Sequence, residues 1–308
     1  MPTSNVIAIF CSDIHLSHTK PAARAGEPDW YEAQARPLRQ LAKLAKKHGC
    51  PIVCAGDVFD HWNAPAELIN FAIRELPPMY AIPGQHDLPH HSYDDIKRSA
   101  YWTLVEAEVI TNLKPGEWER IGANDGWFRA HPFPWGHEVK PPIYTGQRDI
   151  AIIHKYVWRA GAGYPGAPEE LRTAAYHTKL SDYAYAVFGD NHKGFLYNNI
   201  LNCGAFMRRK SDEIDYNPAV GLLTKNKDGF KIMRHPLNID VDIIDNVAKA
   251  KAPEYSSADL TRLFRELRSL EACELDFVEA VRQGLADRDI SDEARKILLQ
   301  TLERHHVS

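Results

Sequence analysis

The sequence has few cysteines and no long apolar run near its N-terminus. Only five cysteines occur among its 308 residues, and they are scattered along the chain. An odd, dispersed set predicts reduced core residues and argues against a disulfide framework. The five apolar residues from Val6 to Phe10 have no basic segment before them, which argues against a secretory signal or a membrane span. We therefore expect a cytoplasmic protein with no membrane partner.

The chain also lacks a strong charge of either sign. Its formal net charge is −4, which does not by itself indicate a nucleic-acid binder. The charge is uneven, because residues 237–308 hold ten basic and fifteen acidic residues whereas residues 193–234 hold eight basic and four acidic ones. We expect any polyanion to bind the second of these segments, and Arg208, Arg209 and Lys210 are the candidate contacts to a DNA backbone. A solvated basic edge is the alternative.

Five short polar segments follow five apolar runs in the chain. The runs have the length of strands and end at glycine or polar residues. Open α/β sheets bind ligands at the carboxyl ends of their strands, so we expect the polar segments to meet at one edge. In chain order the segments are Asp13-Ile14-His15, Gly56-Asp57, Gly84-Gln85-His86-Asp87, His154 and Gly189-Asp190-Asn191-His192.

The side chains of these segments predict a site for two divalent cations. Such a pair needs a bridging carboxylate and further oxygen and nitrogen ligands on each side. No cysteine belongs to the set, so the ligands favour Mn²⁺, Mg²⁺, Fe or Zn²⁺. We assign Asp57 as the bridge, Asp13, His15 and His192 to one ion, and Gln85, His154 and Asp190 to the other.

His86 lies beside the candidate ligand Gln85. We expect it to face the open side of the site as the acid that protonates the leaving oxygen, with Asp87 orienting its ring. Each fragment alone is weak evidence for a metal site, because Gly-Asp is common in turns and most lone histidines are structural. The prediction depends on the whole ordered set.

Periodicity gives the coarse organisation of the chain. Helical patterns alternate with strands over residues 6–110, which indicates a largely parallel sheet. Later strands follow without long helices and indicate a second, mixed or antiparallel sheet packed on the first. The expected helices cover residues 31–48, 65–76 and 92–105, and the later strands cover 127–130, 150–153, 184–188, 195–200, 220–224 and 230–233.

Two further segments are irregular or change pattern. Gly161 to Pro168 breaks regular structure and is either a lid beside His154 or a plain connector. Beyond Pro236 apolar residues recur at helical spacing. We therefore expect two domains, at residues 1–236 and 237–308, the second a helical extension that packs on the body or binds a partner.

The order of the motifs resembles that of the calcineurin-like metallophosphoesterases, whose motifs are Asp-x-His, Gly-Asp, Gly-Asn-His-Asp/Glu, a lone His and Gly-His-x-His. The resemblance covers residues 6–192. It implies an α/β fold, a four-layer α/β/β/α metallophosphoesterase sandwich, here with a helical C-terminal extension. It also implies hydrolysis of phosphate esters.

Within that superfamily the chain is similar to the SbcD-type DNA repair exonucleases, including phage-encoded ones. The similarity depends on residues 84–89, on His154 followed by Trp158, and on residues 206–213 before the strand at 218–220. It implies cleavage of phosphodiester bonds in DNA by a metal-bridged hydroxide attacking in line. It also implies Mn²⁺ as the working metal, with Mg²⁺ as the alternative, a homodimer, and a coiled-coil ATPase of the SbcC type as partner.

Two positions depart from the superfamily pattern. Gln85 stands where asparagine is usual, and Asp190 stands where histidine is usual. Gln reaches further than Asn and Asp reaches less far than His, so the two changes compensate if both contact one ion. A weak or empty second site is the alternative. It would favour a non-catalytic metal-binding module, and a phosphatase for small molecules or phosphoproteins is the other rival.

Overall fold

The computed structural model describes residues 5–244, apart from residues 124–125, 143–147, 165–166, 178–179 and 228 and the side chains of Asn5, Ala174 and His177. These residues belong to the first of two compact units, residues 1–247. The helices expected in the C-terminal extension lie outside the described residues.

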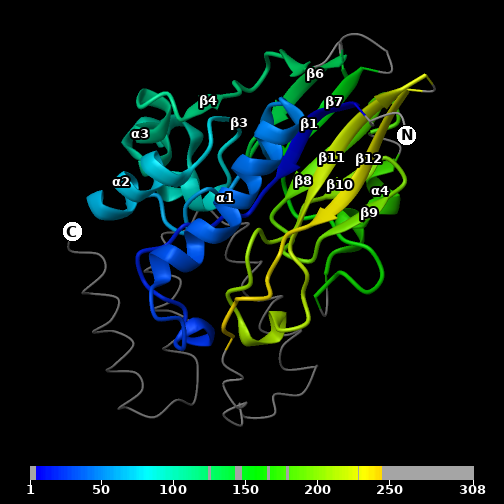
Figure 1. Cartoon of the computed structure of the whole chain (residues 1–308). Coiled ribbons are helices and arrows are strands. Elements are labelled where there is room, and N and C mark those ends of the chain that lie inside the picture. The colour runs from blue at the N-terminus through cyan, green and yellow to red at the C-terminus, as the bar shows by residue number, and fades with distance from the viewer. Residues whose placement is uncertain are drawn as a thin grey trace, which may run out of the picture. The chain divides into compact units, whose positions relative to one another are not determined.

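The first sheet has six strands in the order β12-β11-β1-β2-β3-β4 (Figure 1). Strands β1 to β4 are parallel, and β11 pairs antiparallel with both β1 and β12. Their bounds are β1 Asn5–Cys11, β2 Ile52–Cys54, β3 Met79–Ala81, β4 Ile110–Asn112, β11 Ala219–Asn226 and β12 Gly229–Pro236.

Three helices cover one face of this sheet. They are α1 (Trp30–His48), α2 (Ala66–Glu75) and α3 (Ala100–Glu106). The α1 helix begins where the Asp29 carboxylate accepts a hydrogen bond from the Glu32 amide, and it ends at Gly49, whose φ of 57° few other residues adopt.

The second sheet has the order β5-β6-β7-β8-β10-β9. Strands β6, β7, β8 and β10 are parallel, and β5 and β9 are antiparallel edges. A short helix, α4 (Thr173–His177), contributes to its outer face. The strands are β5 Glu119–Ala123, β6 Gly126–Phe133, β7 Asp149–His154, β8 Tyr185–Gly189, β9 Phe195–Tyr197 and β10 Ile200–Asn202.

Three apolar clusters define the layers. One joins α1, α2 and α3 to the first sheet through residues such as Leu38 and Ile9. The second lies between the sheets, where Phe10 packs edge-on against Phe128 with ring centroids 5.8 Å apart. The third, which includes Tyr176 of α4, covers the outer face of the second sheet. The predicted four-layer α/β/β/α sandwich is therefore confirmed.

The local predictions differ from the structure in several places. The helix expected at 92–105 divides, because Ser99 caps α3 through the Trp102 amide and a separate 3₁₀ segment precedes it. The strand expected at 195–200 is the hairpin β9-β10, which turns at Asn198 with a φ of 51°. Strands β11 and β12 join the first sheet, while the centre of the second sheet is parallel.

None of the helices within the described ranges is long and apolar enough to cross a bilayer. The four cysteines in the same part of the chain, Cys11, Cys50, Cys54 and Cys203, are buried free thiols.

Candidate metal centre

The five polar segments meet at the carboxyl ends of strands from both sheets. Asp13 and Asp57 follow the parallel neighbours β1 and β2, and the Asp13 amide donates to the Gly56 carbonyl at 2.9 Å. His154 is the last residue of β7, and Asp190 directly follows β8. Gln85 begins a 3₁₀ turn shortly after β3. The site therefore depends on the two sheets packing face to face.

One group of ligand atoms surrounds His15. Its Nε2 lies 3.1 Å from Nε2 of His192, 3.6 Å from Oδ2 of Asp57 and 3.9 Å from Oδ1 of Asp13. Donor atoms of Asp13, His15 and His192 lie within 4.8 Å of one another. These are the residues predicted to hold one ion, with Asp57 beside them.

A second group surrounds His154, whose Nε2 lies 3.3 Å from Oδ2 of Asp57. Asp13 completes this group within the same 4.8 Å limit. Among the described residues, Asp57 Oδ2, His154 Nε2 and Gln85 Oε1 are buried without a hydrogen-bond partner. Buried polar atoms are normally satisfied, so Asp57 Oδ2 and His154 Nε2, which lie 3.3 Å apart without a hydrogen bond, fit two ligands of a divalent cation. Asp57 lies in reach of both histidines, as a bridging ligand must.

Backbone strain is concentrated at the predicted ligands. Asp13, His15, Asp57 and Asp190 have φ values of 52°, 49°, 55° and 87°. Left-handed backbone is uncommon for residues other than glycine and typically persists where function requires it. The left-handed backbone after these strands costs conformational free energy, and it turns these side chains toward one another.

The glycines of three motifs make room for the imidazole of His154. A Cβ on Gly56 would lie 2.1 Å from His154 Nδ1, one on Gly189 would lie 2.8 Å from the same atom, and one on Gly84 would lie 2.6 Å from His154 Nε2. The ring is held by a 2.6 Å hydrogen bond between Nδ1 and the Ala55 carbonyl. That bond leaves Nε2 directed at Asp57.

Burial and neighbouring charges shift the pKa values of the candidate ligands. Burial raises the pKa of Asp13 to about 6, and burial lowers the pKa of His15 well below its usual range. Burial also opposes a charge on His154, but the adjacent Asp57 carboxylate outweighs it and raises the His154 pKa. A proton on His154 must leave before a cation can bind its Nε2, so binding is expected to release protons.

The two residues that depart from the superfamily pattern contact each other. Gln85 Nε2 donates to Asp190 Oδ1 at 3.0 Å, which leaves Gln85 Oε1 buried and unbonded within the described chain. The Asp190 amide donates to Asp13 Oδ1 at 3.0 Å. The changes at these two positions are therefore physically linked.

His86 lies at the rim of the centre, but Asp87 does not orient it as expected. The Asp87 carboxylate is buried and accepts hydrogen bonds from the amides of Val58, Phe59 and Gly84. The His86 ring is instead held through Nδ1 by the carbonyl of Asp60 at 2.8 Å. Asp87 therefore supports the loop that carries the ligands.

Sequence reasoning missed two acidic residues at the site. Asp60 Oδ1 lies 3.5 Å from His15 Nδ1, and Glu213 Oε1 lies 3.8 Å from His192 Nδ1. Each faces the ring nitrogen of a predicted ligand that points away from the other ligands, a position that fixes ring orientation. The signal available for Asp60 was its place three residues after Asp57, at the end of the same turn.

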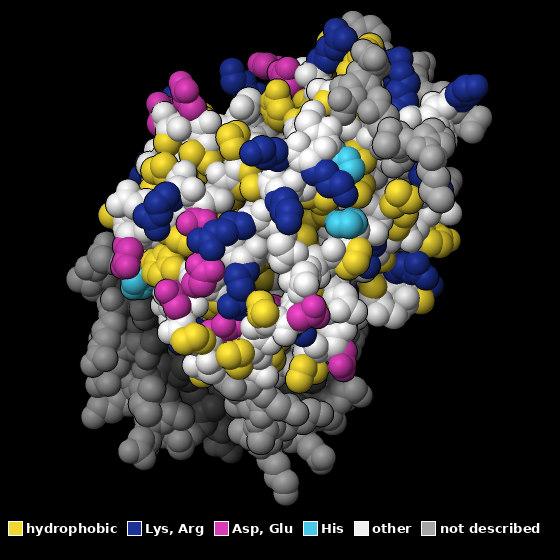
Figure 2. Space-filling view, in the orientation of Figure 1, with side chains coloured by type: hydrophobic (Ala, Val, Ile, Leu, Met, Phe, Trp, Pro, Cys, Tyr) yellow, Lys and Arg dark blue, Asp and Glu magenta, His cyan; other side chains and the backbone are white. Residues whose placement is uncertain are grey.

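The three basic residues proposed to contact DNA have different surroundings in the structure. Arg208 is buried, and its guanidinium donates to the carbonyls of Ile214 and Ile239. Arg209 forms a two-pronged ion pair with Asp60, at 2.6 and 2.9 Å. Only Lys210 is exposed. On the face that α1 and β12 share, Figure 2 shows basic side chains interspersed with acidic and apolar ones.

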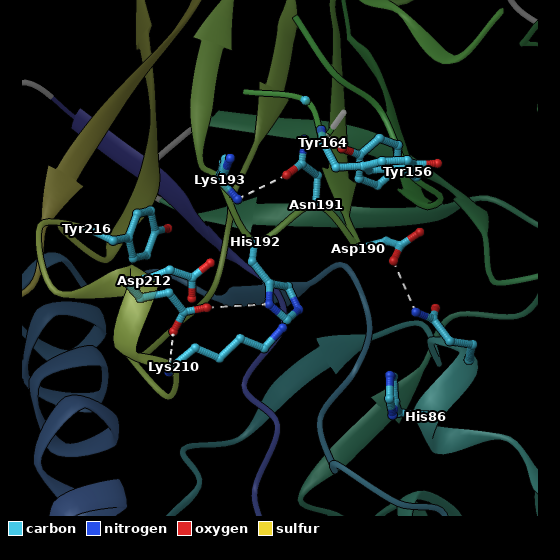
Figure 3. Close-up of a pocket in the computed structure, with 13 residues that line it drawn as sticks. His86, Tyr156, Tyr164, Asp190, Asn191, His192, Lys193, Lys210, Asp212 and Tyr216 are labelled. Carbon is cyan, nitrogen blue, oxygen red and sulfur yellow. Dashed lines mark hydrogen bonds and ion pairs between the residues drawn. The ribbon is translucent and has the colours of Figure 1, made fainter. Parts of the chain in front are cut away.

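Three adjoining cavities lie at or beside the metal centre. A cavity of about 300 Å³ above Asp13 and His15 shares four lining residues, including His86 and His192, with a cavity of about 550 Å³. On its other side it shares three lining residues, including Asp60, with a cavity of about 540 Å³. We refer to these three adjoining cavities together as the groove, and Figure 3 shows the largest of the three.

The family of the chain follows from a comparison of its sequence with protein families. The Calcineurin-like phosphoesterase family matches residues 8–194, more than half of the chain and all five polar segments. The chain belongs to this family. The matched family is one of metal-dependent phosphoester hydrolases, and the Asp and His clusters of this chain are groups that could hold its divalent metals.

Solved structures with a related fold have low sequence identity to the chain. A putative 5′-nucleotidase from Staphylococcus aureus is 10% identical with a TM-score of 0.48, and the match covers 85% of this chain and 58% of that one. The calcineurin-like phosphoesterase YfkN from Bacillus subtilis is 12% identical with a TM-score of 0.43, covering 87% and 98%. Phosphopantetheinyl hydrolase from Mycobacterium tuberculosis is 13% identical with a TM-score of 0.39, covering 82% and 99%. No curated protein matches the sequence.

Proposed function

We propose that this phosphoesterase cleaves phosphodiester bonds in DNA, as an SbcD-type nuclease with His86 as the acid that protonates the leaving oxygen. The observation that carries the proposal is the groove, in which the cavity lined by Asp13 and His15 adjoins two further cavities through different parts of its wall. A phosphodiester within a polymer has a nucleotide on each side of the scissile phosphate. A phosphomonoester needs space on one side only.

The exposed charges along the groove support the proposal. Lys193 and Lys210 are exposed on the wall of the largest cavity. Lys20 lines the cavity of about 540 Å³, where it is half-buried and its Nζ donates to the Glu27 carbonyl. Cationic side chains on both sides of a scissile phosphate suit a polyanion. Arg208 does not contribute, because it is buried against internal carbonyls.

Two divalent ions in the site would lower the pKa of a water molecule and offset negative charge on the phosphoryl oxygens. The role of His86 in this proposal is to donate a proton from one defined nitrogen atom. Its Nδ1 is bonded to the Asp60 carbonyl, which leaves Nε2 as the nitrogen available to a substrate, and the residue lines both the central and the largest cavity. A leaving oxygen in the groove would accept the proton from Nε2.

The working ion proposed is Mn²⁺, with Mg²⁺ as the alternative. Asp13, Asp57 and Asp190 provide three carboxylates and Gln85 adds an amide oxygen, and oxygen ligands favour such hard cations. A homodimer and an SbcC-type ATPase partner remain part of the proposal through the resemblance of residues 84–89 and 206–213. Light scattering of the purified protein would show whether it is a homodimer.

The experiment is a comparison of substrates. End-labelled single- and double-stranded DNA are incubated with Mn²⁺ or Mg²⁺ beside bis-aryl and mono-aryl phosphate esters. We expect metal-dependent cleavage of DNA and of the bis-aryl diester, and slower cleavage of the monoester. Hydrolysis of the monoester alone would assign the protein to the small-molecule or phosphoprotein phosphatases. No turnover with stoichiometric metal bound would indicate a binding module.

A further inference from the structure

A tyrosine pair lies on the wall of the largest cavity, outside the metal centre. Tyr156 and Tyr164 have ring centroids 5.1 Å apart, and the Tyr164 amide donates to the Tyr156 hydroxyl at 3.2 Å. Tyr164 is 38% exposed and both residues line the cavity. Figure 3 shows the two rings on the same side of the cavity as Asp190, with Lys210 on the other side.

The loop that carries the pair is fixed to the metal site by Asn191. This side chain is buried, and its Nδ2 donates to the carbonyls of Val157 and Ala162 at 2.8 and 2.7 Å. Its Oδ1 accepts from the Lys193 amide at 3.0 Å. Asn191 itself lies between the ligands Asp190 and His192. The Asn191 amide therefore joins the loop that carries the tyrosines to the segment that carries the candidate ligands Asp190 and His192.

The loop also packs closely on its own side chains. Trp158 donates from Nε1 to the Pro168 carbonyl at 2.7 Å, and a Cβ on Gly163 would lie 2.9 Å from the Trp158 ring. Ala162 is buried. The alternatives for residues 161–168, a lid beside His154 or a plain connector, both stay open, but the described part of the segment is held by these contacts. It is a built wall of the cavity.

We propose that Tyr156 and Tyr164 form a stacking subsite for the nucleobase next to the scissile phosphodiester, and that Asn191 is the residue that positions it. The inference rests on the proposed action on DNA, and it assigns a nucleobase as the group that the largest cavity binds. Aromatic side chains bind bases by stacking with little sequence preference, because every base offers a π-face. The exposed Lys193 and Lys210 in the same cavity would face the adjoining backbone.

The test compares bonds with and without a neighbouring base. Three phosphodiesters are used: oligothymidylate, the same oligonucleotide with tetrahydrofuran abasic residues flanking one bond, and methyl p-nitrophenyl phosphate. The variants are Tyr156→Ala with Tyr164→Ala, and the matched control Trp118→Ala. Trp118 is 43% exposed and lines a different cavity.

For the wild type we expect kcat/KM at the abasic bond to be lower by about five- to a hundredfold, the range for loss of a stacked base. The double tyrosine variant should lose a similar factor on oligothymidylate, mainly through KM, and should no longer distinguish the abasic bond. Its rate on methyl p-nitrophenyl phosphate and its metal content should match the wild type. Trp118→Ala should behave as wild type on all three substrates.

Asn191→Asp keeps the shape of the side chain but removes both Nδ2 hydrogen bonds. We expect it to keep its metal content and to lose discrimination between the normal and the abasic bond. A purely structural role would lower the rate on all substrates equally.

Two results would overturn the subsite, and each is distinct from failure of the proposed function. Equal wild-type rates at normal and abasic bonds, or equal losses by the tyrosine variant on all three substrates, would reject the stacking subsite alone. A wild type that cleaves methyl p-nitrophenyl phosphate but neither oligonucleotide would reject action on DNA, and the subsite with it.

Discussion

At the scale of single residues, the centre is built from side chains whose neighbours fix their orientation. Ala55, Glu213 and Asp60 face the outer nitrogens of His154, His192 and His15. Such partners set the tautomer and direction of a ligating imidazole. The ligands were identifiable from the chain because their residue types are chemical requirements. Their partners were not, because a backbone carbonyl or a carboxylate at the right distance leaves no pattern in the sequence.

The first prediction concerns His86 as an acid and not a ligand. His86→Ala should retain both metal ions and lose turnover by about 10²- to 10⁴-fold, the usual effect of removing a general acid. Metal content by elemental analysis and kcat on a phosphodiester measure the two effects. His235→Ala, an exposed histidine of β12, is the matched control. Loss of metal from His86→Ala would assign it to the ligand sphere instead.

The second prediction concerns the contact between Gln85 and Asp190. We expect wild-type activity to be highest with Mn²⁺ or Mg²⁺ and poor with Zn²⁺, because the added carboxylate favours hard cations. Gln85→Asn and Asp190→His should each weaken the second ion more than the double variant does, since the two side chains lie 3.0 Å apart and share one sphere. Calorimetric titration of the wild type, both single variants and the double variant measures the coupling. Additive effects would show that the two positions are independent.

At the scale of elements, strands β6 and β7 are joined by an ion pair to the buried Asp149, at the end of β7 opposite His154. Asp149 accepts from Arg129 Nε and Nη2 at 2.6 and 2.7 Å and from His131 Nε2 at 2.7 Å. Burial alone would raise the Asp149 pKa, but these partners outweigh it and hold the pKa below its ordinary value. The carboxylate thus stabilises the fold in its ionised form.

The third prediction follows from this pair. Asp149→Asn should destabilise the protein by about 3 kcal/mol at neutral pH, because it leaves the Arg129 charge without a full partner. A depressed pKa gives stability that is present above the unfolded value, near 3.9, and is lost as the pH falls through the folded value. The difference in urea midpoint between wild type and variant should therefore be constant above about pH 5 and narrow below pH 4. If the difference in urea midpoint is unchanged at pH 3, Asp149 does not stabilise the fold through its ionised form.

Element boundaries were predicted well where local chemistry sets them. The α1 helix ends at Gly49 as expected, since a left-handed C′ residue favours glycine. The hairpin at Asn198 and the break before Ser99 were missed, because the apolar patterns on each side are continuous with a single element. Tertiary packing chose the shorter elements in both cases.

At the scale of the whole molecule, the candidate metal centre spans the two sheets. It collects ligands from β1 and β2 in the first sheet and from β7 and β8 in the second, and four ligands have left-handed backbone. The protein therefore bears the cost of strain and of buried, unsatisfied donors, which bound cations would offset.

The fourth prediction is that divalent ions stabilise the fold. Mn²⁺ at a hundred times its dissociation constant should raise the free energy of unfolding by about 2.7 kcal/mol for each site. Thermal unfolding with and without Mn²⁺ gives the shift for each protein separately. Asp57→Asn should lose most of the shift, whereas Asp149→Asn, which lies at the other end of β7, should keep it. An unchanged midpoint in the wild type would show that the centre does not bind the ion.

The sequence by itself determined which residue types stand at the strand ends, and through them the candidate ligands, while the order of these motifs carried the resemblance that implied the four-layer fold. These features are local: a short apolar run, a glycine and a polar side chain lie next to each other in the chain. Only the tertiary structure decided that Asp60 and not Asp87 holds His86, that Arg208 is buried, and that the centre lies in an open groove. Those outcomes depend on distances between segments far apart in sequence, which the packing of the two sheets sets.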